Sequence, residues 1–236
     1  MDVKQGLLTQ TQKGKKMKEL KIKSGQSLTC SKIIAVGRNY SEHIREMGAV
    51  PTGEPILFLK PATSLCDINQ PLFIPSQYGA VHHELELALL IGRGGRDITE
   101  QKALEHIAGY GLALDLTLRD LQAVAKKKGM PWAVAKGFDG ACPITPVFVP
   151  REYVPDPHKL EIMLKINGEI RQQGNTSHMI FSLPFLIAYI SRFFTLEEGD
   201  VILTGTPSGV GQLHDGDQLE ARLDGVADVR TEIKAV

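Results

Sequence analysis

The stretch 82-HHELELALLIG-92 has the alternation of a β-strand, and the rest of the sequence can be arranged around it. Side chains of a strand point in turn to its two faces, so residues two apart share a face. The odd-numbered residues from Leu85 to Ile91 are apolar and are expected to enter the core. Glu84 and Glu86 then share the other face, where their carboxylates repel each other. A divalent cation between them would reverse that repulsion, and two solvated glutamates on a half-exposed strand are the alternative.

A third acidic residue, Asp115, ends an apolar run of strand length in 109-GYGLALDLTLRDLQ-122. A carboxylate at the end of a buried strand is costly unless it is paired or bound to a cation. Glu84, Glu86 and Asp115 together form an all-oxygen set of hard ligands, which suits Mg²⁺ or Mn²⁺. His82 shares the glutamate face, and both a ligand role and a supporting role are open for it.

A helix is predicted directly after this strand, over residues 118–128. Thr117 and Asp120 have the spacing of a capping box at its start. The lysines at 126–128 are expected to be solvated at its C-terminus, where they complement the helix dipole.

Further polar residues are predicted near Asp115. Arg119 and Gln122 lie three apart on the first turn of the helix and are able to face the same cavity. Lys136 lies in the apolar segment 131–140. Partial burial would lower its pKa unless a carboxylate or a bound anion offset it, and a structural lysine is the alternative.

Near the N-terminus, 31-SKIIAVGRNY-40 predicts a buried strand, and Ser41 is suited to cap a short helix over residues 42–47. His43 and Glu46 lie three apart on that helix and share a face. A carboxylate beside an imidazole raises its basicity and fixes its orientation, which a general base needs. An ordinary surface pair is the alternative.

The remaining segments predict short strands and turns. Residues 50–75 combine proline with short apolar runs. Lys60 is expected at a strand end on the surface, and contact with a substrate is the alternative. Hairpin turns are predicted at 167–168 and at 224–225, and an amphipathic helix over 182–194.

Two further elements complete the secondary-structure prediction. A helix is predicted over residues 100–108, capped by Thr99. The segment 199-GDVILTGTPSGVG-211 predicts a strand and a turn in which backbone amides and the Thr206 hydroxyl are suited to hold a carboxylate.

Composition bounds the class of protein. The 236 residues, 42% hydrophobic and 23% charged, suit one α+β, mainly β domain over residues 17–236 after a polar tail over 1–16. Lys plus Arg equals Asp plus Glu, 27 each, and no apolar run has the length of a membrane span. Neither nucleic acid nor a membrane is therefore an expected partner. The three cysteines form no CxxC pair, and no apolar secretory segment is present, so a cytoplasmic protein with reduced thiols is expected.

Several segments, taken in order, resemble the fumarylacetoacetate hydrolase family, and in particular its small single-domain branch of acylpyruvase type. The likeness covers roughly residues 18–236. The segments that carry it are GRNYSEHIREMG, HHELELALLIG, LDLTLRDLQ, the segment around Lys136, NGEIRQQG and GDVILTGTPSGVG. Their joint occurrence is far more specific than any one of them.

The resemblance implies a mixed β-sandwich roll with a few short helices, a homodimer, and a small 2-oxo acid as substrate. It also assigns roles to single residues. They are the metal ligands Glu84, Glu86 and Asp115, the catalytic residues His43, Glu46 and Lys136, and the substrate-binding residues Arg119, Gln122 and Thr206. His43 and Glu46 would activate water on a short lid helix, while Lys136 and Gln122 would stabilise a developing oxyanion or enolate.

The reaction that the resemblance favours first is hydrolysis of the C–C bond of an acylpyruvate to pyruvate and a carboxylic acid. The substrate would chelate Mg²⁺ (or Mn²⁺), water activated by His43 would attack the distal ketone, and pyruvate would leave as a metal-bound enolate. Oxaloacetate keto–enol tautomerisation and oxaloacetate decarboxylation are close alternatives, and isomerisation or decarboxylation of aromatic-catabolism diacids is a further one. A metal-stabilised binding module is the non-enzyme alternative, and it predicts a closed metal site with no cavity near His43.

Overall fold

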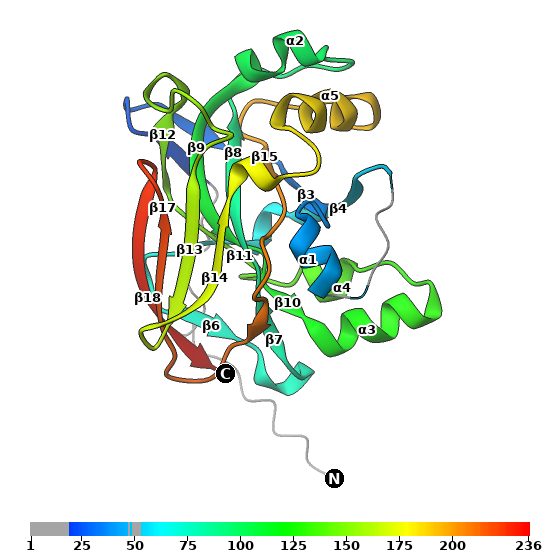
Figure 1. Cartoon of the computed structure of the whole chain (residues 1–236), viewed down its shortest axis with the longest axis vertical. Helices are drawn as coiled ribbons and strands as arrows, with labels where there is room; N and C mark the ends of the chain where they lie inside the picture. The colour runs from blue at the N-terminus through cyan, green and yellow to red at the C-terminus, as the bar shows by residue number, and fades with distance from the viewer. Residues whose placement is uncertain (1–18, 47, 49–52) are drawn as a thin grey trace.

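The computed structural model describes residues 19–46, 48 and 53–236. The polar tail expected over 1–16 and the last residue of the first expected helix, Met47, lie outside the described residues. Strands and a few short helices make up the described part, which confirms the α+β, mainly β class (Figure 1). None of the helices in these ranges is long and apolar enough to cross a membrane.

The strands of the described residues form three sheets. The ten-stranded sheet is mixed, and its main order is β2 (Ser27–Thr29), β1 (Glu19–Ile22), β12 (Val147–Pro150), β9 (Ile107–Leu114), β8 (Leu85–Ile91), β15 (Val201–Leu203), β3 (Lys32–Gly37) and β4 (Ile56–Pro61). Attached to it through β9 are β11 (Cys142–Ile144) and β5 (Leu65–Asp67). The five-stranded sheet has the order β14 (Glu169–Asn175), β13 (Glu161–Ile166), β17 (Gln218–Leu223), β18 (Ala227–Ala235) and β6 (Leu72–Ile74). The three-stranded sheet consists of β10 (Thr117–Leu118), β7 (Val81–His83) and β16 (Gly211–Gln212).

Helices lie mainly on the side of the large sheet that faces away from the β13–β14–β17–β18 hairpins (Figure 1). The α-helices are α1 (Ser41–Glu46), α2 (Glu100–Ala103), α3 (Arg119–Lys128), α4 (Ala133–Lys136) and α5 (Leu183–Phe193). Single 3₁₀ turns occur at Ala62–Ser64, Ser76–Tyr78, Leu104–His106, Arg151–Tyr153 and Thr176–His178. The helices α3 and α4 pack against each other, and both contact β10; α1 lies beside α4 in the view of Figure 1.

Strand β8 is buried on both faces. Its odd-numbered residues from Leu85 to Ile91 belong to the larger hydrophobic core, as the alternation predicted. Its other face is not half-exposed, because Ala88 and Leu90 belong to a second core and Glu86 is only 1% exposed. The position of β8 between β9 and β15 in the ten-stranded sheet explains this burial, since neither of its edges meets solvent.

Several predicted elements are confirmed. The strand β3 and the helix α1 follow the expected order, and the first hairpin turns at Asn167 and Gly168, whose φ values of 54° and 83° are typical of a type I′ turn. The helix α5 begins after Ser182, whose hydroxyl accepts a hydrogen bond from the backbone N–H of Phe185 (3.3 Å).

Two local predictions are wrong, and tertiary contacts explain both. The helix expected over 100–108 ends early, because β9 begins at Ile107 and pairs with Ile91 of β8. The capping box at Thr117 and Asp120 does not form. Thr117 lies in β10, and the carboxylate of Asp120 instead accepts a hydrogen bond from the backbone N–H of Ala80 (2.9 Å).

Candidate active site

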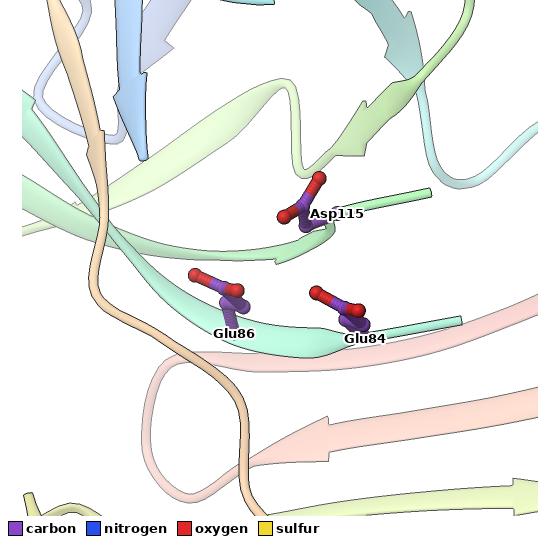
Figure 2. Close-up of side chains that lie close together, drawn as sticks. All are labelled: Glu84, Glu86 and Asp115. Carbon is purple, nitrogen blue, oxygen red and sulfur yellow. The ribbon is translucent and has the colours of Figure 1, made fainter. Parts of the chain in front are cut away.

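Three carboxylates meet in the interior where β8 and β9 lie side by side. Glu84 precedes β8, Glu86 lies within it, and Asp115 directly follows β9. The register sets their approach, because the backbone N–H of Asp115 donates to the carbonyl of Glu84 (2.8 Å) and Glu86 pairs with Ala113. One carboxylate oxygen of each lies within 4.8 Å of the others. Figure 2 shows the two glutamates rising from one strand toward the aspartate.

The pKa values of Glu84 and Glu86 are shifted in opposite directions. Burial, together with the nearby carboxylates of Asp115 and Glu84, raises the pKa of Glu86 well above its usual value. Its hydrogen bond from the backbone N–H of Gly205 (2.6 Å) opposes this only in part. Burial also opposes the ionisation of Glu84, but the ammonium of Lys136 and the guanidinium of Arg119 hold its pKa below the usual range. The free cluster therefore favours a proton on Glu86 and a charge on Glu84.

Lys136 connects two of the carboxylates. Its ammonium donates to Glu84 Oε2 (2.8 Å) and to Asp115 Oδ2 (2.6 Å). Burial alone would lower the pKa of Lys136, but the two carboxylates overcome that effect and raise it. The lysine therefore stays a cation, which is the outcome expected of a buried lysine beside a carboxylate. It is carried by the short helix α4.

Lys60 is a further part of this network, and its predicted surface position is wrong. Its side chain is fully buried, and its ammonium donates to the carbonyls of Lys136 (2.5 Å) and Ala141 (2.8 Å). It also lies 2.6 Å from Asp115 Oδ1 as an ion pair. The alternation of the strand places Lys60 on the same side as Phe58, which was a signal for burial in the sequence.

Arg119 contacts the cluster, and Gln122 contacts Arg119. Arg119 donates through Nη2 to Glu84 Oε1 (2.5 Å) and through Nη1 to Gln122 Oε1 (2.7 Å). His82 is not one of the clustered ligand groups. Burial and the charge of Arg119 lower the pKa of His82 to about 4, so its imidazole is neutral at pH 7.

The proposed dyad lies on α1 and contacts the turn after β15. His43 is buried, and its Nδ1 lies 3.2 Å from Glu46 Oε2. The backbone N–H of Gly209 donates to both carboxylate oxygens of Glu46 (3.1 Å each). Because Gly205 of the same turn donates to Glu86, one turn joins the acidic cluster to the His43–Glu46 pair.

The amides of this turn therefore hold carboxylates of the protein rather than a free ligand. Gly205 and Gly209 have φ values of 98° and 92°, which favour glycine. A Cβ at Gly205 would meet Cβ of Asn39 at 2.7 Å, so the turn also needs glycine for space. The hydroxyl of Thr206 donates to the carbonyl of Leu85 (2.9 Å), and its contact with a substrate stays a prediction.

Gln172 is a site residue that the sequence analysis missed. It is fully buried, and its amide nitrogen donates to Thr206 Oγ1 (2.7 Å) while its amide oxygen accepts from the backbone N–H of Leu85 (3.0 Å). It thereby ties the turn after β15 to the start of β8. A register shift in the hairpin between Leu164 and Lys165 breaks the alternation of β14, so no periodic signal marks Gln172.

The cluster suits a hard dication. Its ligands are carboxylate oxygens, which Mg²⁺ and Mn²⁺ prefer. Asp115 Oδ1 is buried and lies 2.6 Å from the ammonium of Lys60, so a cation already offsets part of its negative charge. A cavity of about 210 Å³ opens beside α1, and Ser41 and Glu42 of this helix line part of it together with Pro207. The residues that line this cavity do not include the three carboxylates.

Comparison with known proteins identifies the family. The model of the fumarylacetoacetate (FAA) hydrolase C-terminal family matches residues 32–234. The chain belongs to the fumarylacetoacetate hydrolase family. It is therefore an enzyme of this family, as the motifs indicated.

The similar proteins have the names of two types of enzyme, an oxaloacetate tautomerase and a fumarylpyruvate hydrolase. The chain is 54% identical over 195 residues to "Oxaloacetate tautomerase YcgM" of Escherichia coli, covering 83% of this chain and 89% of the relative. It is 50% identical over 202 residues to "Oxaloacetate tautomerase FAHD1, mitochondrial" of Mus musculus, covering 86% and 91%. A crystal structure of fumarylpyruvate hydrolase from Pseudomonas aeruginosa in complex with Mn²⁺ and pyruvate matches with a TM-score of 0.88 at 38% identity, covering 92% and 96%.

Replacing Lys60 tests its buried role. We expect Lys60→Met to lower the free energy of unfolding by roughly 3–5 kcal/mol, because Asp115 and two carbonyls would lose a buried cationic partner. Urea denaturation of metal-free protein measures the change. Lys102→Met, at an exposed position of α2, is the matched control and should have little effect. Equal stability of the two variants would contradict the assignment.

Metal binding should release protons. Burial and the neighbouring carboxylates raise the pKa of Glu86, and a carboxylate must be ionised to bind a dication. Affinity for Mn²⁺ should therefore keep rising as the pH rises beyond the range in which an ordinary carboxyl group ionises. Titration calorimetry in buffers of different ionisation enthalpy counts the released protons. Glu86→Gln should bind Mn²⁺ more weakly and release fewer, whereas an unchanged proton count in that variant would remove Glu86 as their source.

Proposed function

We propose that the protein is a Mg²⁺- or Mn²⁺-dependent enzyme of 2-oxo acids and that its main reaction is keto–enol tautomerisation of oxaloacetate. The observation that carries the proposal is the buried carboxylate cluster beside the His43–Glu46 pair, with one turn contacting both. Acylpyruvate hydrolysis was the first choice from the sequence. The names of relatives at 50% and 54% identity support the tautomerase instead.

Glu84, Glu86 and Asp115 would hold the dication, which supplies Lewis-acid polarisation of the 2-oxo group when bound. Arg119 keeps Glu84 ionised and oriented through their direct contact. The ammonium of Lys136 is positioned to stabilise negative charge on the substrate oxygen as the enolate develops.

Proton transfer would belong to His43. If Nδ1 carries the proton toward Glu46 Oε2, the second ring nitrogen is a base. That nitrogen would remove a proton from C3 of the keto form, and a proton delivered to the 2-oxo oxygen by the imidazolium or by solvent would complete the enol. The reverse reaction would take the proton from that oxygen and return one to C3. Glu46 is itself fixed by the backbone N–H of Gly209, so the imidazole has a defined orientation.

C–C bond hydrolysis of an acylpyruvate is the second candidate. It is favoured by the likeness to a fumarylpyruvate hydrolase solved with Mn²⁺ and pyruvate. His43 would then activate water in place of abstracting a carbon-bound proton. The cavity beside Ser41 and Glu42 gives room near the lid helix, which counts against the binding-module alternative with its closed site.

The other expectations from the resemblance stay predictions. The homodimer rests on the family likeness, the cytoplasmic location rests on the cysteine usage, and the carboxylate ligands suit both Mg²⁺ and Mn²⁺. Multi-angle light scattering and metal analysis of the purified protein measure the first and the third.

The metal role predicts the behaviour of Glu84→Gln. The variant should lose its metal-dependent activity and bind Mn²⁺ more weakly, because a neutral amide replaces a charged ligand. Ultraviolet absorbance of enol-oxaloacetate follows the reaction, and calorimetry follows the metal. Glu105→Gln, at an exposed position, should match the parent protein. Unchanged turnover in Glu84→Gln would remove the metal role.

Substituting His43 separates the candidate reactions. We expect His43→Ala to lower kcat for oxaloacetate tautomerisation by roughly 10²–10⁴ and to spare decarboxylation, which needs only an electron sink. Side-by-side assays of both oxaloacetate tautomers, acetylpyruvate and fumarylpyruvate measure this. His214→Ala, an exposed histidine, is the control. Turnover of acetylpyruvate well above that of enol-oxaloacetate in the parent protein would favour the hydrolase.

A further inference from the structure

Every oxygen of two cluster carboxylates already has a cationic partner. Glu84 Oε1 contacts the guanidinium of Arg119, and Glu84 Oε2 contacts the ammonium of Lys136. Asp115 Oδ2 also contacts Lys136, and Asp115 Oδ1 lies 2.6 Å from the ammonium of Lys60. A dication that binds these carboxylates would therefore share their oxygens with other cations and be repelled by them.

The ammonium of Lys60 is fixed independently of the carboxylate that it contacts. Its other acceptors in the described part of the chain are backbone carbonyls, those of Leu116 (3.4 Å), Lys136 (2.5 Å) and Ala141 (2.8 Å). These carbonyls remain in place when a ligand binds Asp115, so the Lys60 ammonium stays beside that carboxylate. The ammonium of Lys136 instead donates to the cluster carboxylates themselves, so it is able to turn toward a substrate oxygen when they bind a metal.

The charge of Lys60 is also the least screened by solvent among the three cations. Its side chain has no exposed surface, compared with 3% of the Lys136 side chain and 23% of the Arg119 side chain. Water and dissolved ions weaken the field of an exposed charge much more than that of a buried one. Lys60 therefore places a fixed positive charge close to Asp115, where it opposes any dication in the cluster.

We propose that Lys60 is a positioning residue that weakens binding of the dication in the absence of substrate, so that a bound anion is needed to hold the metal tightly. Lys60 keeps Asp115 in place for the metal while its charge repels the metal. The negative charge of a 2-oxo acid would offset this repulsion. Metal and anion would then raise each other's affinity, because coupling between two ligands is reciprocal. The choice of a 2-oxo acid rests on the proposed function, whereas the effect of Lys60 on the metal does not.

Mn²⁺ alone is the probe for the first test. Calorimetry on the full-length, metal-free protein should show about tenfold tighter Mn²⁺ binding by Lys60→Met than by the parent protein, because the substitution removes a buried charge beside a ligand. Lys60→Gln keeps an N–H donor for the carbonyls and should shift the affinity in the same direction. A purely structural role predicts weaker binding by both variants.

Ser191→Ala is the control for lost stability. Ser191 is buried in α5, outside the cluster, and its hydroxyl oxygen accepts a hydrogen bond from the backbone N–H of Ile98 (2.9 Å). The substitution should lower the free energy of unfolding and leave the affinity for Mn²⁺ unchanged. Mn²⁺ binding by both Lys60 variants that is no tighter than that of the parent protein would overturn the proposal.

The parent protein supplies a second test that needs no substitution. Pyruvate and pyruvamide both offer two adjacent oxygens for chelation, and only pyruvate is an anion. Affinity for Mn²⁺ should rise about tenfold in saturating pyruvate and much less in pyruvamide, and the rise with pyruvate should be smaller in Lys60→Gln. An equal rise with the two compounds, or a rise as large in Lys60→Gln as in the parent protein, would overturn the proposal.

Oxaloacetate tautomerisation, measured in parallel, separates this inference from the proposed reaction. A parent protein without turnover whose affinity for Mn²⁺ still depends on Lys60 would overturn the reaction alone. Normal turnover together with an affinity for Mn²⁺ that is insensitive to Lys60 would overturn the role of Lys60 alone.

Discussion

The site depends on the balance between three buried carboxylates and the cations that surround them. Glu84, Glu86 and Asp115 would repel one another strongly in the interior of the large sheet if they stood alone. Lys136 and Lys60 offset this repulsion through direct contacts with Asp115, and a raised pKa keeps a proton on Glu86. A dication would complete the balance and displace that proton. The arrangement is thus stable enough to fold and is also prepared for a metal.

The register of two strands in the fold brings the three carboxylates together. Pairing of β8 with β9 sets Glu86 opposite Ala113 and brings Asp115 beside Glu84. A shift of one residue would turn every side chain of β8 to the other face and separate the cluster. The turn after β15 adds a second constraint, because its backbone amides donate to Glu86 on one side and to Glu46 of α1 on the other.

Most of the fold class and the cluster could be predicted from the sequence, because strand alternation and turn residues are local signals. For example, the alternation of the strand predicted that Glu84 and Glu86 share a face. Lys60 was predicted at the surface and Gln172 was missed, because the burial of both follows from the packing of distant segments. For Gln172, a bulge in the hairpin also breaks the alternation of its strand. The helix expected up to residue 108 failed for a similar reason, because sheet pairing at Ile107 outweighed local helix propensity.

The central claim is that one dication lies among these three carboxylates, and anomalous diffraction from a crystal soaked in Mn²⁺ tests it directly. We predict one strong peak about 2.1 Å from a carboxylate oxygen of each of Glu84, Glu86 and Asp115. No peak at the cluster, or a peak only at exposed acidic residues, would contradict the account.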